Sequence, residues 1–205
     1  MNRLPDLTGK RTFIIAGGPR LDYEKVELLK DEWTIGVNSA FLFDPKINYS
    51  NDRRFYNLVE NHPKWEEYSG IKVFQSNGRQ PYPKDVITIK PNNREVVALR
   101  QNGFWHGNNS GFGAIQLAIY LGSREIYLLG FDMECAGHRV HWHCEYAHQN
   151  NTPEFRNEKL LTFKKQIEDF APMWFSENID IQIIGFSTLR CFERTTLQEV
   201  LQSHL

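Results

Sequence analysis

The chain has 205 residues, of which 40% are hydrophobic and 13% aromatic, so its composition excludes a disordered protein and allows one domain with a sizeable core. Its 24 Lys and Arg residues balance 25 Asp and Glu residues, and a net charge of -1 gives no general attraction to nucleic acid or an anionic membrane. No apolar run is long enough to span a bilayer, and the N-terminus does not resemble a signal peptide.

The first half of the chain alternates predicted strands with predicted helices. Residues 11–18 (RTFIIAGG) predict a strand that runs into a glycine-rich turn, and Asp22 is the expected N-cap of a helix over residues 22–30. Apolar, β-branched runs and one helical pattern follow, predicting strands at 33–38, 47–52, 71–76 and 85–90 and a helix at 53–60.

The second half continues the alternation after an irregular stretch at 91–107. Residues 112–120 predict a helix, and 125–129 (EIYLL) predict a buried strand. A polar loop over 135–153 precedes a helix from Pro153 to about Phe170, and the chain closes with a strand at 179–186 and a helix at 195–201. This order predicts an α/β fold with a mostly parallel central sheet, in a single domain over 1–205.

Several of the predicted strands end in small or polar residues. The ends are Gly17-Gly18-Pro19, Asn38, Asn51-Asp52 and Gly130-Phe131-Asp132. The carboxyl ends of parallel strands share one edge of a sheet, and ligands of open α/β sheets bind at that edge. We therefore expect these residues to line a single crevice.

Each of these groups also has a purely structural interpretation. The Gly17-Gly18-Pro19 turn would let backbone N–H groups approach a phosphate, or would simply connect a strand to a helix. It lacks the G-x-G-x-x-G pattern of nicotinamide-cofactor sites. Asn38 and Asn51 can offer a donor and an acceptor to a base or sugar, or serve as turn residues.

The start of the helix at 112–120 is a further candidate. Asn109, Ser110 and Gly111 precede it, and they can cap the helix, contact an anion at its N-terminus, or do both.

The loop GHRVHWHCEYAHQNN, residues 137–151, holds four of the seven histidines. We expect a histidine here to act as a general base, His143 first and His141 second, with Tyr146 and His148 beside it. A phosphate-binding role for the loop is also favoured over a transition-metal site built from these histidines and Cys144, and a solvent-exposed loop without function is the third alternative. The odd cysteine count (Cys135, Cys144 and Cys191) indicates a reducing, cytoplasmic setting.

Five arginines fall near the expected crevice and could neutralise a phosphate, although a solvated surface role is the commoner one for each: Arg20, Arg53, Arg54, Arg139 and Arg156.

Three segments together resemble a known superfamily. FIIAGGPRLD, then WTIGVNSAF, then NNSGFGAIQLAIYLGSREIYLLGFDM resemble the bacterial sialyltransferases of glycosyltransferase family 42 and the wider MptE-like group, which includes 6-hydroxymethylpterin diphosphokinases. Uncharacterised phage proteins of that group are the most similar, since they share the GFDM strand end, the HWH loop and a tail like FERTTLQEVL. The resemblance implies a Rossmann-like three-layer sandwich.

For the sialyltransferases the pattern implies a CMP-sugar donor. By this resemblance Gly18-Pro19, Asn38, Asn51 and Ser110-Gly111 would contact the nucleotide. Family tyrosines that bind the donor phosphate and a histidine that acts as base come from the region after the Gly-x-Asp strand, which here holds Tyr146 and the loop histidines.

Three functions are therefore open at the level of sequence. The first is a nucleotide-binding, glycosyltransferase-like enzyme that uses a nucleotide-sugar. The second is a Mg²⁺-dependent diphosphokinase in which Asp52, Asp132 and Glu134 hold the metal. The third is a phage or prophage protein that keeps the fold without catalysis. The oligomeric state is open, and a homo-oligomer is one option.

Overall fold

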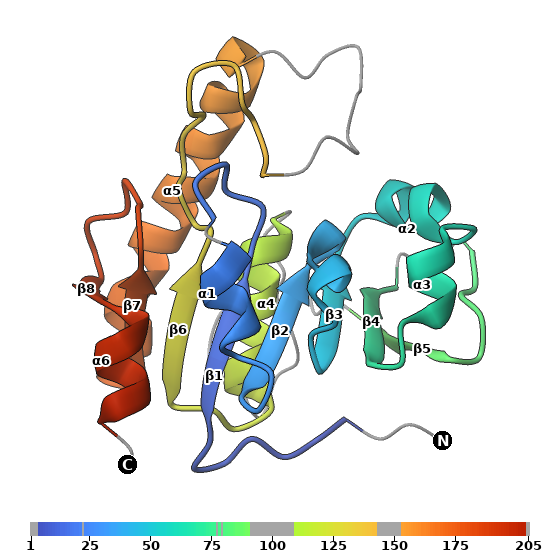
Figure 1. Ribbon diagram of the computed structural model, residues 1–205, viewed down its shortest axis with the longest axis horizontal. Helices are drawn as coiled ribbons and strands as arrows, with labels where there is room; N and C mark the ends of the chain where they lie inside the picture. The colour runs from blue at the N-terminus through green and yellow to red at the C-terminus, as the bar shows by residue number, and fades with distance from the viewer. Residues whose placement is uncertain are drawn as a thin grey trace.

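The computed structural model describes residues 4–21, 23–76, 78, 80–90, 109–142 and 153–203, and for residues 23, 24 and 153–155 it describes the backbone only. The described strands form one eight-stranded sheet in the order β5-β4-β3-β2-β1-β6-β7-β8, and every neighbouring pair is parallel (Figure 1). Their bounds are β1 Arg11–Ile15, β2 Trp33–Val37, β3 Ile47–Ser50, β4 Ile71–Gln75, β5 Val86–Ile89, β6 Glu125–Leu129, β7 Asp180–Ile184 and β8 Glu193–Thr195.

Helices cover both faces of the sheet, because the central strands are apolar on both sides. On one face Ile14 and Leu128 pack with α4 (Ser110–Tyr120) and α5 (Pro153–Ser176). On the other face the alternate residues Phe13 and Leu129 pack with α1 (Tyr23–Glu27), the 3-10 helix η1 (Asn38–Phe43) and α6 (Leu197–Gln202). The predicted α/β fold, Rossmann-like with three layers, is confirmed.

A separate aromatic cluster fills the β4–β5 side of the sheet. There α2 (Arg53–Val59) and α3 (Pro63–Glu67) pack on Phe74 through Phe55 and Trp65. This side lies at the far end of the sheet from α5 and α6 (Figure 1).

The long helix α5 extends beyond its predicted end near Phe170. It continues to Ser176 although Pro172 lies inside it, where proline removes a helical hydrogen bond. Ile167, Ala171 and Trp174 recur at helical spacing and are fully buried in the core. The burial of this stripe outweighs the local cost of the proline, and the sequence-based boundary was therefore too early.

Other boundaries also differ from the predictions. The second strand ends at Val37 rather than at Asn38, because Asn38 takes a left-handed conformation (φ 53°) and begins η1. The last helix begins at Leu197, since Thr196 is its N-cap and Thr195 ends β8. The short elements α3, η1 and β8 were not predicted, and the expected cap Asp22 lies outside the described residues.

The strand order places a topological switch at the centre of the sheet. The chain adds β2 to β5 on one side of β1, then returns to place β6 on the other side of β1. Connections after β1 and β6 therefore diverge, which opens a crevice beyond the carboxyl ends of these strands.

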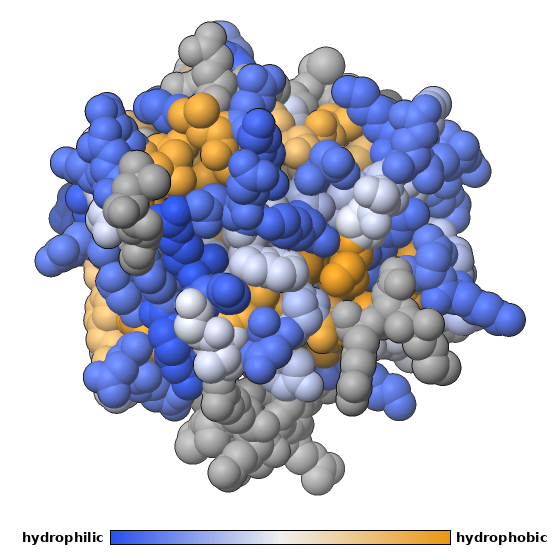
Figure 2. Space-filling view, turned by 60° about the horizontal axis from the view of Figure 1, so that its bottom comes forward, coloured by the Kyte–Doolittle hydropathy of each residue, from blue (hydrophilic) through white to orange (hydrophobic). Residues whose placement is uncertain are grey.

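The surface seen in Figure 2 is mostly hydrophilic, with separate hydrophobic patches between the polar side chains. Within the described part of the chain, no helix has the length and apolar character that crossing a membrane requires.

Candidate functional site

A cavity of about 290 Å³ lies at this switch point. Its walls come from the turns after β1, β2, β3 and β6, from the N-terminus of α4 and from the first turns of α5. Many sequence-predicted residues meet here, among them Gly17, Gly18, Pro19, Asn38, Asn51, Asp52, Asn109, Ser110, Gly111, Gly130, Phe131, Asp132 and His141.

The turn after β1 is held against the turn after β6. The Gly18 N–H donates to the Gly130 carbonyl at 2.8 Å, and a Cβ on Gly18 would come within 2.0 Å of Asp132 Oδ1. Only glycine fits here, because the neighbouring carboxylate already occupies the space. Gly18 therefore has a steric requirement that is independent of any ligand.

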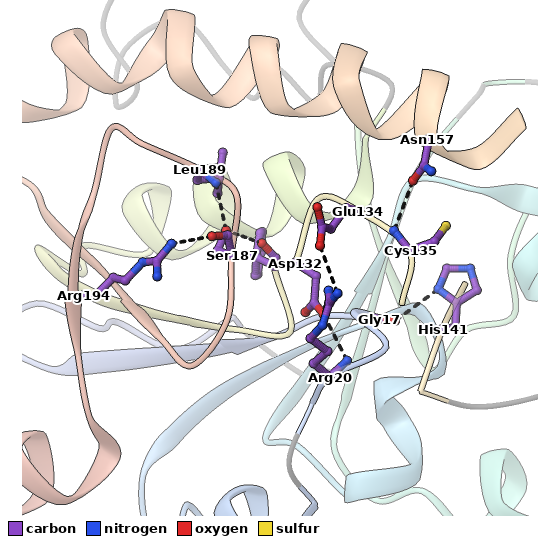
Figure 3. A network of polar contacts seen from close by, with 11 residues as sticks. Gly17, Arg20, Asp132, Glu134, Cys135, His141, Asn157, Ser187, Leu189 and Arg194 are labelled. Carbon is purple, nitrogen blue, oxygen red and sulfur yellow. Dashed lines mark hydrogen bonds and ion pairs between the residues drawn. The ribbon is translucent and has the colours of Figure 1, made fainter. Parts of the chain in front are cut away.

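Asp132, after β6, also holds the turn after β1 in place. Its Oδ2 accepts the backbone N–H of Arg20 at 3.0 Å, and the Arg20 side chain reaches both Asp132 (3.5 Å) and Glu134 (2.9 Å) (Figure 3). The side chain of Asp132 is 2% exposed, and burial raises the pKa of its carboxyl group, against which the contacts with Arg20 act. The carboxylate therefore holds the two turns together at the cavity wall.

The three carboxylates proposed for Mg²⁺ already have partners within the protein. Asp132 and Glu134 share Arg20, whereas Asp52 is the N-cap of α2 and accepts the Arg54 N–H at 2.8 Å. In the described ranges no group of three or more His, Cys, Asp or Glu side chains is arranged to hold a metal ion.

Asn38 lines the cavity and has a side-chain polar atom without a partner among the described residues. Its backbone carbonyl accepts a hydrogen bond from Asn48 Nδ2 at 3.1 Å, which fixes the residue in its left-handed conformation. Its side-chain Oδ1 is buried and has no hydrogen-bond partner among the described residues. A buried acceptor without a partner costs free energy, so this atom is suited to receive a donor from a ligand.

Asn51 and Ser110 bind one another. The Ser110 hydroxyl donates to Asn51 Oδ1 at 2.5 Å and accepts the Asn51 backbone N–H at 3.2 Å. The pair joins the turn after β3 to the start of α4. The amide Nδ2 of Asn51 takes no part in the pair.

Asn109 is the N-cap of α4. Its Oδ1 accepts hydrogen bonds from the N–H groups of Gly111 (2.9 Å) and Phe112 (3.4 Å). Its backbone carbonyl accepts a hydrogen bond from the Gly113 N–H. These N–H groups are thus used by the cap rather than left for an anion. The amide Nδ2 of Asn109 is buried without a partner among the described residues, so Asn109 caps the helix, lines the cavity and keeps an unused donor.

His141 is the loop histidine that the structure places in the cavity wall. Its Nδ1 lies 3.1 Å from the Gly17 carbonyl and, as the donor to that oxygen, leaves Nε2 as the basic nitrogen. Burial lowers the pKa of His141, the hydrogen bond to Gly17 raises it, and the charge of Arg156 lowers it, with a net downward shift. The ring is therefore neutral at pH 7, as a general base must be.

The remaining candidates of the loop cannot be placed. His143, Tyr146 and His148, with Cys144, lie outside the described residues, and His138 is exposed and away from the cavity.

The first turns of α5 supply a wall that the sequence indicated only in part. Arg156, Lys159, Leu160 and Phe163 line the cavity at the i, i+3, i+4 and i+7 positions of one helical face. Lys159 was not among the predicted residues. Its position three residues after Arg156 places it on the same face of the helix, and this spacing could have identified it. This face combines two cations with two apolar side chains.

The five candidate arginines divide between the cavity and the surface. Arg54 and Arg156 line the cavity, and Arg20 is occupied by Asp132 and Glu134. Arg53 stacks on Tyr56 and Tyr82, and the exposed Arg139 belongs to a tight turn.

Comparison with solved structures shows a shared fold. The chain matches the MAf glycosyltransferase from Magnetospirillum magneticum AMB-1 with a TM-score of 0.64 and 14% identity, over 93% of this chain and 34% of that protein. It therefore spans about a third of the length of that glycosyltransferase. It also matches the sialyltransferase CstII from Campylobacter jejuni, solved with the substrate analogue CMP-3FNeuAc, with a TM-score of 0.45 and 16% identity over 85% of this chain and 80% of that one; we draw nothing from this weaker match. No family model and no curated protein sequence matches the chain.

Proposed function

We propose that this chain is a nucleotide-binding, glycosyltransferase-like enzyme that uses a nucleotide-sugar donor of the CMP-sugar type. The proposal rests on two asparagines that line the cavity, Asn38 and Asn109, each of which has a buried side-chain atom (Oδ1 and Nδ2, respectively) with no partner among the described residues. One is an acceptor and the other a donor, so a ligand that carries both kinds of group, such as a nucleotide with its base and ribose, would complement them.

The position and size of the cavity support the same reading. It lies at the carboxyl edge of the sheet beside the central switch point, where α/β proteins bind nucleotides. Its volume of about 290 Å³ is at the lower end of the range for small-molecule sites. The cavity would therefore hold the nucleotide part of a donor. The fold shared with a solved glycosyltransferase is consistent with this class of activity.

The charged groups suggest where the donor phosphate would lie. Arg156 and Lys159 reach the cavity from α5, and Arg54 reaches it from α2. Such cations stabilise a phosphate that gains charge as it leaves. In the proposed reaction an acceptor hydroxyl attacks the anomeric carbon, the bond from that carbon to the phosphate oxygen breaks, and the nucleotide departs.

The proton of the acceptor hydroxyl would pass to Nε2 of His141. The hydrogen bond from Nδ1 to Gly17 selects the tautomer in which Nε2 is basic, and burial keeps the ring neutral. His143, the first choice from the sequence, stays the alternative base. Release of CMP from a CMP-sugar donor by His141→Gln and His143→Gln, compared side by side, decides between them.

Nucleotide binding is tested by isothermal titration of CMP, CDP and UDP into the wild type and Asn38→Gly. Glycine accepts the left-handed backbone of residue 38, so this variant removes the amide without adding strain. We expect the loss of the hydrogen bond to weaken binding by about tenfold.

Asn178→Gly is the matched control. Asn178 has the same left-handed backbone (φ 57°) but does not line the cavity, so this variant should bind like the wild type. The proposal is wrong if the wild type binds none of the three nucleotides, or if both glycine variants bind equally well.

A further inference from the structure

One indole side chain ties the histidine to the turn after β1. Trp142 follows His141, is 7% exposed, and donates its Nε1–H to the Ala16 carbonyl at 3.1 Å. Its backbone N–H is directed at the Gly17 carbonyl at 3.4 Å, the same oxygen that His141 Nδ1 meets at 3.1 Å. Two consecutive residues of the loop therefore attach to two consecutive carbonyls just beyond β1.

The indole ring is also fixed by packing. Trp142 lies in the core cluster on the α1 and α6 face of the sheet, with Phe13 and Leu129, and its ring centroid is 4.6 Å from that of Phe43 in η1. A side chain buried among three elements and bonded at its polar end has one orientation. Because His141 directly precedes Trp142 in the chain, the position of its backbone is restricted as well.

The other side of the histidine is constrained by Gly17. A Cβ on Gly17 would lie 3.0 Å from His141 Nδ1, so the ring occupies the space that a side chain at position 17 would fill (Figure 3 shows His141 beside Gly17). His141 is thus enclosed between the turn and the loop that Trp142 anchors.

We propose that Trp142 is a positioning residue that holds the His141 ring against the Gly17 carbonyl in the wall of the cavity. The turn that would contact the nucleotide and the histidine that would take the proton then form one rigid unit. The catalytic consequence rests on the proposed function, whereas the positioning of the ring does not.

The test is the titration of the His141 ring by NMR in the wild type and in Trp142→Phe, with His141→Gln used to assign the signal. Phenylalanine keeps most of the buried ring and removes the N–H donor. A released ring gains water, and because burial is the main cause that lowers the pKa of His141, we expect the pKa to rise toward its ordinary value of 6.5.

The charged groups that line the same cavity must be considered in this titration: Arg156 and Lys159 from α5, Asp132 and Glu134 after β6, and Asp52 and Arg54 after β3. Arg156 acts in the same direction as burial, so movement of the ring away from it also raises the pKa. Loss of the Gly17 hydrogen bond acts oppositely and is the smaller effect than burial.

Trp33→Phe is the matched control, because Trp33 lies at the start of β2, at the other end of the strands from the cavity. It should leave the His141 titration unchanged. Gly17→Ala tests the opposite side of the ring with Trp142 intact, and should move the titration in the same direction as Trp142→Phe. If Trp142→Phe does not fold, hydrogen exchange of the Trp142 indole N–H in the wild type is the test, because a buried and hydrogen-bonded N–H exchanges slowly.

Turnover provides the second readout. If the enzyme releases nucleotide, Trp142→Phe should lower kcat by about tenfold or more and leave the KM for the donor within about threefold, because a displaced base affects the chemical step rather than nucleotide binding. An unchanged His141 titration in a folded Trp142→Phe, or rapid exchange of the Trp142 indole N–H in the wild type if that variant does not fold, overturns the inference even where nucleotides bind. Failure of every nucleotide to bind overturns the proposed function alone.

Discussion

Replacement of Gly18 by alanine should be far more costly than a single methyl group suggests. The new Cβ would lie 2.0 Å from Asp132 Oδ1 and 2.5 Å from the Gly130 carbonyl oxygen. Neither atom can move away without loss of free energy, since Arg20 binds the carboxylate and the Gly130 carbonyl belongs to the backbone of the turn after β6. The two turns must therefore separate.

The magnitude follows from what that separation breaks. Overpacking of a core costs about 1–3 kcal/mol. Loss of the Gly18 to Gly130 hydrogen bond adds about 1 kcal/mol, and loss of the bond between the Arg20 N–H and the buried carboxylate of Asp132 adds about 1.5–3 kcal/mol. The sum is about 3.5–7 kcal/mol, a large part of the stability of an ordinary domain.

The assay is urea unfolding of Gly18→Ala beside Gly17→Ala, a matched substitution one residue away. At position 17 the nearest atom is His141 Nδ1 at 3.0 Å, against 2.0 Å for the Asp132 oxygen at position 18, so we expect a clearly smaller loss than for Gly18→Ala. Gly18→Ala within about 1 kcal/mol of the wild type, at an unchanged slope against urea, would refute the reasoning.

A double mutant identifies the clashing atoms. Asp132→Ala removes the carboxylate but leaves the Gly130 carbonyl in place. Gly18→Ala combined with Asp132→Ala should therefore cost less than the sum of the two single changes by about 1 kcal/mol or more. Additive losses would mean that the two residues do not meet.

Three further outcomes are expected. Asp52→Ala should lower the free energy of unfolding by about 1 kcal/mol through loss of the α2 cap, whereas Asp52→Asn keeps the cap and should be nearly neutral in the same urea titration. Gly113→Ala should lower the melting temperature clearly, because its Cβ would lie 2.5 Å from the Tyr49 hydroxyl in the packing of α4 on β3; a neutral result contradicts that close approach. The pKa of His141 is lowered, so below pH 6.5 the unfolded chain takes up a proton that the native ring resists, and wild-type stability falls on acidification. The unfolding free energy of His141→Gln should therefore fall less than that of the wild type between about pH 6.5 and 5.5. Parallel curves for the two proteins would contradict this.

The architecture was largely predictable because the local signals agree with the tertiary structure. Apolar runs such as EIYLL form buried parallel strands, and the residues after them gather at one edge because parallel strands allow nothing else. The end of α5 could not be predicted in this way. A local rule stops a helix at Pro172, whereas the burial of Trp174 depends on packing that the local sequence does not contain.

The candidate site was predictable as a set of positions but not as a set of roles. That Asn51 pairs with Ser110, 59 positions away, follows from the packing of α4 on β3. Asn38 has a left-handed backbone, and its carbonyl accepts a hydrogen bond from Asn48 of the neighbouring strand β3. Which polar atoms are used and which stay unpartnered is therefore decided in three dimensions.

The pairing of β1 with β6 has a consequence for how the protein folds. Phe13 of β1 pairs with Tyr127 of β6 in the sheet. In the sequence, all of the strands β2 to β5 lie between these two residues. Closing so long a loop is slow, so the earlier strands can assemble before β6 docks. The crevice exists only after β6 has docked, because the residues that follow β1 form one of its walls and the residues that follow β6 form another. A bound nucleotide would therefore select the fully assembled chain, and its affinity would add directly to the resistance of the protein to unfolding.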